Sequence, residues 1–279
     1  MNLYIDYGGT NFRYQINDEA VQSNNSQSVD LVNFLENMIV SKGIKKIAIS
    51  FAGQVNNGKI ISAPNISLHN LDIKEYIWSK YKVQLEIEND LKCATLFESS
   101  LQKEAKSMVV VYIGTGVGCG LIVNHQLISG KNNFAGELGH IPFKATPFRC
   151  GCSRNDCLEL SLSGKALKLW SEYYCIGVNE YRLKTIQNHP LGKPIAKRFE
   201  EALQHLFFTL LNLYDPEVFV FGGGVMQSNP QLLENLKEFY DKSAFKSVRS
   251  APKILLSSST NGSLEGAKIL LQHKGNIYE

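Results

Sequence analysis

The sequence predicts an α/β protein with two lobes that descend from a duplicated unit. Apolar strand-like segments alternate with segments of helical periodicity along the 279 residues. A strand, a glycine-rich turn and a second strand occur at 3–16, and the same arrangement recurs at 108–123. The length is sufficient for two domains, each with its own hydrophobic core. We therefore expect an N-terminal lobe at 1–107 and a C-terminal lobe at 108–263.

Composition and charge argue against several classes of protein. The chain is 44% hydrophobic and 20% charged with a net charge of +3, and it has no run of basic residues interleaved with aromatic ones. Nucleic-acid binding therefore has no electrostatic support. The most apolar window, 108–123, is interrupted by glycines and is too short to span a bilayer. No basic leader precedes the first strand, and Cys93, Cys119 and Cys175 suit a reducing compartment. We expect a cytoplasmic protein with no membrane partner.

The expected strands and helices give each lobe its order. Further strands are expected at 45–51, 83–88, 218–221 and 254–256. Helices are expected at 29–41, 91–102, 165–174, 193–214, 232–240 and 264–272. The first of these strands ends at Gly53, where open α/β sheets bind their ligands. Asn89 and Asp90 follow the strand at 83–88, and both are also ordinary helix N-cap residues.

Four potential metal ligands are clustered between 137 and 157. Cys150, Cys152 and Cys157 lie within eight residues, and His140 precedes them by ten. Three thiolates and an imidazole match a closed tetrahedral zinc site. A disulfide is the alternative, although a C-x-C pair bridges poorly. Glu137 and Glu159 flank these ligands without being needed by the metal.

Two glycine-rich turns are candidates for binding phosphate groups. The first is D-Y-G-G-T, and the second is G-T-G-V-G-C-G at 114–120. Glycine lets the backbone approach a ligand closely, and its N–H groups can face an anion. The second turn is neither a Walker A motif nor a dinucleotide fingerprint, because both the spacing and the G-K-[ST] ending are wrong. An ordinary β-turn is the alternative for each.

Together these motifs resemble those of the ROK family of sugar kinases and sugar-responsive repressors. The resemblance rests on D-x-G-G-T, E-N-D, the second glycine turn, G-E-x-G-H, C-x-C-x-x-x-x-C-x-E-x-x-x-S-G and D-P-x-x-x-x-x-G-G-G, in that order. The family pattern usually has glycine where this chain has Ser153 and Asp156. Membership implies two actin-like, ribonuclease-H-like lobes with an interlobe cleft and a zinc knuckle. It also implies a homodimer, and a C-terminal helix at 264–279 that packs back onto the first lobe.

The resemblance assigns roles to particular residues. Asp90 is the expected catalytic base, which accepts the proton of the sugar hydroxyl. The cofactors it implies are ATP, Mg²⁺ near Asp6 and a structural Zn²⁺. The residues expected to bind the nucleotide and its metal are Asp6, Gly8, Gly9, Thr10, Gly114, Thr115, Gly116, Gly223 and Gly224. Those expected to bind sugar are Gly53, Asn65, Asn89, Asp90, Glu137, His140 and Glu159. His140 has two roles, binding zinc through one ring nitrogen and sugar through the other.

The predicted activity is ATP-dependent phosphorylation of a hexose at its 6-hydroxyl. Glucose is the first choice of sugar, N-acetylmannosamine is the second, and other hexoses or N-acetylhexosamines are alternatives. A non-catalytic, sugar-responsive regulator is the alternative of a different class. No helix-turn-helix segment precedes Asp6, which disfavours the repressor branch. Asp90 discriminates further, since a sensor has no need of an ionised carboxylate beside two phosphate turns.

Overall fold

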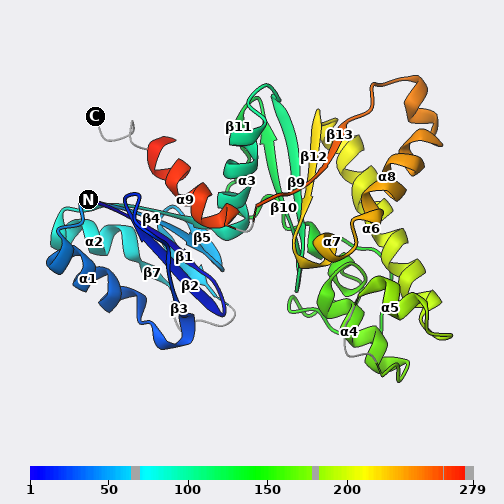
Figure 1. Cartoon of the computed structure of the whole chain (residues 1–279), viewed down its shortest axis with the longest axis horizontal. Coiled ribbons are helices and arrows are strands. Elements are labelled where there is room, and N and C mark those ends of the chain that lie inside the picture. Colours follow the sequence, from blue (N-terminus) through cyan, green and yellow to red (C-terminus); the bar gives the residue numbers. More distant parts are fainter. Residues whose placement is uncertain (64–69, 178–181, 260, 274–279) are drawn as a thin grey trace. The chain divides into compact units, whose positions relative to one another are not determined.

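The computed structural model describes residues 1–63, 70–177, 182–259 and 261–273 and divides into two compact units (Figure 1). Unit 1 comprises Met1–Gln102, Ser129–Ala135 and Ser259–Glu279. Unit 2 comprises Lys103–Ile128 and Gly136–Ser258. The segment 129–135 belongs to unit 1 although it lies between two stretches of unit 2 in the sequence. This assignment matters for the site described below.

Unit 1 is built on a five-stranded sheet with the order β3-β2-β1-β4-β8. Strand β1 pairs antiparallel with β2, and β1, β4 and β8 run parallel. The strands are β1 (Asn2–Tyr7), β2 (Asn11–Ile16), β3 (Gln22–Asn25), β4 (Lys46–Phe51) and β8 (Gln84–Asn89). A small antiparallel sheet in the same unit contains β5 (Gln54–Asn56), β6 (Lys59–Ser62) and β7 (Leu71–Asp72).

Helices lie on both faces of this sheet (Figure 1). Leu3 and Ile5 pack into one core with residues of α1 (Leu31–Lys42) and α2 (Ile73–Tyr81). Tyr4 and Ala48 point to the other face, where they meet α9 (Gly262–His273). Helix α3 (Asp90–Leu101) follows β8 directly and packs along α9. The two-residue period of the strands therefore separates two layers of helices.

Unit 2 repeats the same strand order with different residues. Its sheet has the order β11-β10-β9-β12-β13, with β10 antiparallel to β9 and with β9, β12 and β13 parallel. The strands are β9 (Ser107–Ile113), β10 (Val117–Val123), β11 (Gln126–Leu127), β12 (Val218–Gly222) and β13 (Lys253–Leu256). The expected α/β fold with a duplicated sheet is confirmed.

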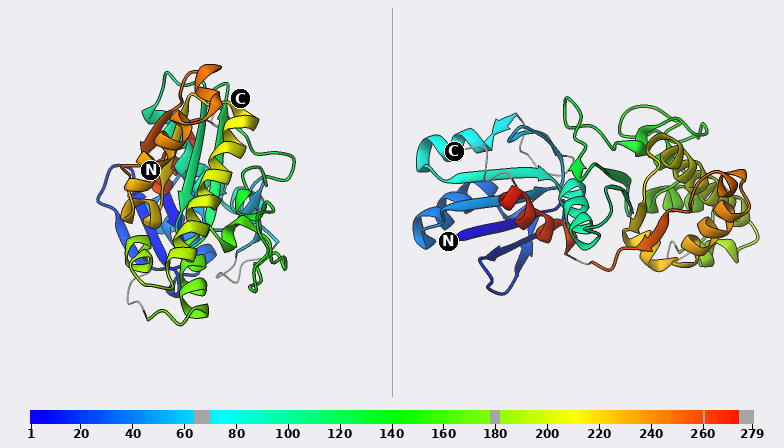
Figure 2. Two further views of the ribbon diagram at one scale, coloured as in Figure 1. Left: turned by 90° about the vertical axis from the view of Figure 1, so that its right-hand side faces the viewer. Right: turned by 90° about the horizontal axis from the view of Figure 1, so that it is seen from above.

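A large apolar core in unit 2 lies between the sheet and its helices. Phe199, Phe207 and Leu210 of α6 (Lys193–Tyr214) are fully buried against strand residues such as Phe219. Figure 2 shows α6 running along this sheet. The remaining helices of unit 2 are α4 (Gly164–Tyr173), α5 (Leu183–Gln187), α7 (Gly224–Ser228) and α8 (Gln231–Asp241).

The long periodic segments and the short strands β12 and β13 were predicted well, and several other short elements were missed. Helix α6 occupies the expected range 193–214, and α1, α3, α4, α8 and α9 each lie within two residues of their expected bounds. Helix α2 and the three-stranded sheet were not expected, because the strands of that sheet are only two to four residues long. Within the described ranges, no helix combines the length and the apolar character needed to cross a bilayer.

Candidate active site and metal centre

Among the predicted sugar and base residues that the structure describes in unit 1, Gly53, Asn89 and Asp90 lie at the carboxyl ends of its parallel strands. Tyr7, Phe51 and Asn89 are in register on β1, β4 and β8. The chain segments that follow these three residues therefore leave the sheet at one edge. Ligands of open α/β sheets bind at this edge.

Asp6 is one of a row of polar residues on one face of this sheet. Arg13 of β2 donates from Nε and Nη2 to Asp6 Oδ2 at 3.1 and 2.5 Å. The Ser50 hydroxyl of β4 donates to Oδ1 at 3.0 Å. Arg13 also donates to Asn261 Oδ1, just before α9. These bonds fix the carboxylate of Asp6 and leave it lone pairs for water, so the donor set fits Mg²⁺ held through water.

The first glycine turn is closed by its own backbone. The N–H of Gly8 donates to Asn11 O at 2.9 Å, and a Cβ on Gly8 would lie 2.9 Å from that same oxygen. Gly8 therefore admits no larger side chain without a shift of the turn. Gly9 is half-buried and Thr10 is exposed, so both are accessible to a ligand.

Asn89 and Asp90 begin α3 at the end of β8. Asn89 Oδ1 accepts from the N–H groups of Leu91 and Lys92 at 3.0 and 3.3 Å, which caps the helix. Its Nδ2 donates to Gly53 O at 3.2 Å, so two of the predicted sugar-binding positions are in contact. Asn89 therefore caps helix α3 and also contacts Gly53, another residue predicted to bind sugar.

The pKa of Asp90 is raised to about 6, chiefly by desolvation at this half-buried position and then by the negative charge of Asp6. The N–H of Leu91 donates to Asp90 Oδ1 at 2.9 Å, and this bond acts in the opposite direction by favouring the carboxylate. Near neutral pH the group is mostly ionised and is a stronger base than an exposed aspartate.

Gly53 lies close to the small sheet of unit 1. A Cβ at this position would lie 2.5 Å from Ser62 O, so the backbone there requires glycine. Asn65, the other residue expected from this region, lies outside the described residues.

The second glycine turn in unit 2 is tied to the start of α4. The N–H of Gly114 donates to Gly116 O at 2.9 Å, which closes the turn between β9 and β10. The N–H groups of Gly164 and Lys165 donate to Gly114 O and Thr115 O at 2.7 and 3.2 Å. The amino end of α4 is therefore held against this turn.

A cavity of about 630 Å³ opens beside this turn. It is lined by Gly114, Thr115, Gly164, Lys165, Lys168, Gly224 and Val225. Three of the predicted nucleotide residues are thus brought together, and two exposed lysines of α4 are added to them. Neither lysine was predicted from the sequence, because an exposed lysine on a helix carries no signal of its own. Lys165 directly follows the S-G of the family motif, and Lys168 lies three residues further on the same side of the helix.

Gly223 and Gly224 lie at the carboxyl end of β12. Gly223 has φ +87°, and a Cβ there would lie 2.5 Å from Ile113 O at the end of β9. Gly224 begins α7 and lines the cavity, with open space where a Cβ would be. The glycine at 223 is required by the backbone, whereas the one at 224 leaves room for a ligand.

The four predicted zinc ligands converge in unit 2. One ligand atom from each of His140, Cys150, Cys152 and Cys157 lies within 4.8 Å of the others. Nδ1 of His140 is 3.4 Å from Cys150 Sγ, and Sγ of Cys152 is 3.3 Å from Sγ of Cys157. Ligands of a tetrahedral zinc site lie roughly 3.7 Å apart, given Zn–S bonds of about 2.3 Å. The donor set therefore fits Zn²⁺, and no disulfide joins these cysteines.

The backbone of the knuckle at Ser153 has a conformation that favours glycine. This residue has φ +72°, in the left-handed region, and its N–H donates to Cys150 O at 2.9 Å. A glycine would adopt this conformation without strain. Asp156 is paired with Arg154 at 2.8 Å on the surface of the knuckle.

Glu159 joins the metal segment to the second glycine turn. Its Oε2 accepts from the N–H of Val117 at 3.2 Å, and a Cβ on Gly116 would lie 2.7 Å from that oxygen. Gly139, next to His140, packs against Val117 and Glu159. Glu137 is exposed at the start of the 3₁₀ helix η2 (Leu138–His140). One carboxylate oxygen of Glu159 is thus committed to the turn, a role that the sequence did not suggest.

Comparison with known proteins identifies a family. Residues 3–274 match the model of the ROK family. An N-acetyl-D-glucosamine kinase of Photobacterium profundum is 30% identical over 262 residues, which cover 87% of this chain and 84% of the relative. A xylose repressor of Bacillus spizizenii is 26% identical over 226 residues, which cover 77% of this chain but 58% of the repressor.

Solved structures share the fold along the whole chain. A ROK family glucokinase from Streptomyces griseus, crystallised with glucose and AMPPNP, superposes with a TM-score of 0.75. The match covers 98% of this chain and 99% of the glucokinase at 21% sequence identity.

Proposed function

The chain belongs to the ROK family, and on this premise we propose that it is an ATP-dependent sugar kinase. The proposed reaction transfers the γ-phosphoryl group of ATP to the primary hydroxyl of a hexose or an N-acetylhexosamine. The observation that carries this proposal is Asp90, a carboxylate of raised pKa beside Asn89 at the ligand-binding edge of the first sheet.

In the proposed step the oxygen of the sugar hydroxyl attacks the γ-phosphorus. A bond forms between this oxygen and phosphorus, and the bond from phosphorus to the β–γ bridging oxygen breaks. The hydroxyl proton passes to a carboxylate oxygen of Asp90, and ADP leaves. Asn89, held by Gly53 O and by the helix cap, is suited to orient the sugar. Positioning of this kind supplies most of the catalysis in phosphoryl transfer.

The phosphate chain of ATP is assigned to the cavity beside the second glycine turn. Lys165 and Lys168 supply positive charge there, and the turn at Thr115 supplies backbone N–H groups. Gly224 leaves space on the wall of the same cavity. Asp6, with Thr10 nearby in sequence, is the proposed site for water-mediated Mg²⁺, whose charge neutralises the phosphate oxygens.

Zinc is proposed to hold the segment that carries the sugar ligands. With Nδ1 of His140 directed at the cysteines, the Nε2 atom remains available for a sugar hydroxyl. Metal ligation fixes the tautomer of this ring and so prepares the second nitrogen for a hydrogen bond. Glu137 and the free oxygen of Glu159 are proposed to bind neighbouring hydroxyls.

N-acetyl-D-glucosamine is the first sugar to test, because relatives with 30% identity or more are named N-acetyl-D-glucosamine kinases. Glucose, the first choice from the sequence, is the second, and N-acetylmannosamine is the third. The residues assigned to the sugar contact ring hydroxyls, so they do not by themselves distinguish these sugars.

A sugar-responsive regulator without catalysis is the second candidate, and the match to a xylose repressor favours it. The test is release of ADP by the purified protein with ATP, Mg²⁺ and a panel of hexoses, N-acetylhexosamines and xylose. We expect one hexose or N-acetylhexosamine to raise ADP release at least ~100-fold over the rate with water alone. Calorimetric binding of a sugar without any ADP release would instead support the regulator.

A further inference from the structure

A buried polar network lies beneath Asn89 in unit 1. Glu88, Lys92 and Asn133 are only 6%, 4% and 8% exposed. Glu88 is the penultimate residue of β8, Lys92 lies in the first turn of α3, and Asn133 lies in the segment 129–135. Charged groups are rarely buried to this degree without a structural or functional reason.

Asn133 joins the buried cation to the buried anion. Lys92 Nζ donates to Asn133 Oδ1 and, at 2.7 Å, to Asn133 O. Asn133 Nδ2 donates to Glu88 Oε1 at 2.6 Å and to Val55 O at 2.8 Å. The amide is therefore oriented by opposite charges at its two ends, and every one of these bonds is buried.

The same carboxylate reaches the predicted sugar ligand. Glu88 Oε1 also accepts from the N–H of Asn89 at 2.8 Å. The side chain of Asn89 then bonds Gly53 O and the N–H groups at the start of α3, including that of Lys92. Lys92 and Asn133 are thus linked to Asn89 through both Glu88 and the first turn of the helix.

The segment 129–135 is also held at its far end. Gly136 has φ +97°, its carbonyl accepts from the N–H of Cys119 at 3.2 Å, and a Cβ on it would lie 1.9 Å from Cys119 O. Glu137 is the next residue. Asn133 is therefore held by contacts inside unit 1, and Gly136 is held by a contact inside unit 2.

We infer that Lys92 and Asn133 are positioning residues for the sugar, acting through Glu88 on Asn89 within unit 1. The inference rests on the proposed function, because it takes Asn89 as a sugar ligand. It adds two residues that touch neither sugar nor ATP. Removing either residue leaves buried polar partners unsatisfied. It also loosens the segment 129–135, which Gln54 Nε2 still holds by donating to Asn132 O and Asn133 O.

The conformation of Asn133 offers a clean substitution. Its φ is +61°, in the left-handed region, where glycine is tolerated without strain. Asn133→Gly therefore removes the amide and keeps the backbone, including the carbonyl that Lys92 contacts. Lys92→Met removes the charge and the donors while keeping most of the volume of the side chain.

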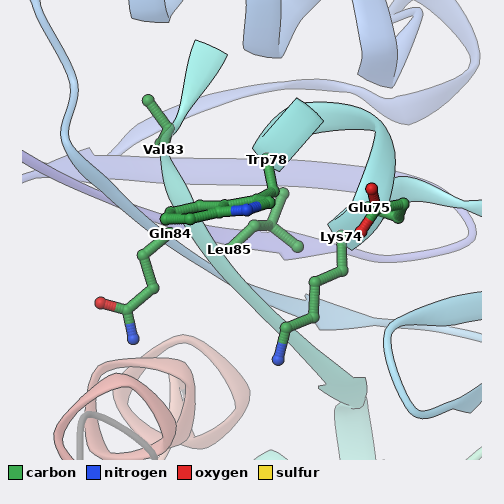
Figure 3. A pocket seen from close by; sticks show the side chains of 6 residues that line it. All are labelled: Lys74, Glu75, Trp78, Val83, Gln84 and Leu85. Atoms are coloured by element: carbon green, nitrogen blue, oxygen red, sulfur yellow. The ribbon is translucent and has the colours of Figure 1, made fainter. Parts of the chain in front are cut away.

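A control is provided by a different buried carboxylate of β8, which bonds a lysine directly. Lys74 of α2 donates to Glu86 at 2.9 Å. It lines a separate cavity of about 350 Å³ with Trp78 at the amino end of β8, opposite to Asn89 (Figure 3). Lys74→Met tests what the loss of a lysine–carboxylate contact costs when the sugar ligands are not involved.

The experiment measures sugar affinity by calorimetry, and KM and kcat by ADP release, for the parent, the three single variants and the Lys92→Met/Asn133→Gly double variant. We expect Lys92→Met and Asn133→Gly each to weaken sugar affinity by about tenfold or more while the KM for ATP stays within about twofold. In the double variant the losses should be less than additive. Lys74→Met should bind sugar with the affinity of the parent, even if its melting temperature is lower.

Parental sugar affinity in folded Lys92→Met and Asn133→Gly would overturn the inference. So would an equal rise in the KM values for sugar and ATP, because that marks a general structural role. Calorimetry separates this result from failure of the proposed function. A parent that binds sugar but releases no ADP refutes the kinase, and its variants still test the positioning role.

Discussion

The two sheets of the molecule share one strand order but carry different chemistry at equivalent positions. In unit 1, Asp6 of β1 is in register with Ser50 of β4 and bonds it. In unit 2, the position in register on β9 and β12 is taken by Tyr112 and Gly222. A Cβ on Gly222 would lie 2.4 Å from the ring of Tyr112, so the glycine makes room for the aromatic side chain. A fixed carboxylate in one sheet is replaced by a neutral ring in the other.

The same contrast continues at the ligand-binding edges. The edge in unit 1 carries two carboxylates, and the charge of Asp6 helps to raise the pKa of Asp90. The edge in unit 2 carries two lysines of α4 beside a glycine turn. Acidic groups suit proton transfer and Mg²⁺, and basic groups suit phosphate. The two sheets share their strand order, and the charged side chains beside the two glycine turns differ in sign, as the proposed separation of the base from the phosphate site requires.

The largest expected effect is the loss of the proposed base. Asp90→Asn keeps the size of the side chain but removes the proton acceptor, so kcat should fall by roughly 10²–10⁴. Sugar affinity by calorimetry should stay near the parental value. Turnover within a few-fold of the parent would remove Asp90 from the chemistry.

A second prediction separates zinc binding from sugar binding at His140. A cysteine is also a good zinc ligand, so His140→Cys should retain about one zinc per chain. It offers no second nitrogen, and sugar binding should weaken by about 1–3 kcal/mol. Elemental analysis measures the zinc content and calorimetry measures the sugar affinity of one preparation. Retained zinc with unchanged sugar affinity would show that His140 binds zinc but not sugar.

Cys152→Ser is the complementary change, because it removes a zinc ligand and leaves Nε2 of His140 in place. We expect zinc content and sugar affinity to fall together, since the metal holds the segment that carries His140 and Glu159. If zinc is lost while sugar binds as before, the metal centre and the sugar site are independent.

The lysines of α4 give a smaller effect on the other substrate. Lys165→Met and Lys168→Met should each raise the KM for ATP by about tenfold and leave sugar affinity unchanged. Lys168 is already near Glu172, at 3.9 Å, so its effect should be the smaller of the two. Initial rates at varied ATP concentration measure the KM for ATP. A loss of sugar affinity with an unchanged KM for ATP would contradict the assignment of these lysines to ATP.

The glycine turns and the cluster of metal ligands lie where the sequence predicted them, and the role of Asp90 as the base stays a prediction; each rests on a local motif. D-x-G-G-T, E-N-D and the cysteine spacing can all be recognised without knowing the fold. Lys92, Asn133 and Lys165 were missed, since their roles depend on partners far away along the chain. Lys92 read as part of an ordinary helix, yet its partner is forty-one residues away. Burial of a charge is a tertiary property that periodicity does not reveal.

The pH dependence of kcat/KM for the sugar tests the central claim most directly, namely that Asp90 is the base at the acidic edge. This ratio reports the ionisation of the free enzyme, and Asp90 must be ionised to accept a proton. With its pKa raised to about 6, kcat/KM should be level above neutral pH and fall about tenfold per unit well below pH 6. The midpoint should move to lower pH in Asp6→Asn, because the neighbouring negative charge is gone. A profile without an inflection between about pH 5 and 7.5 would contradict the account.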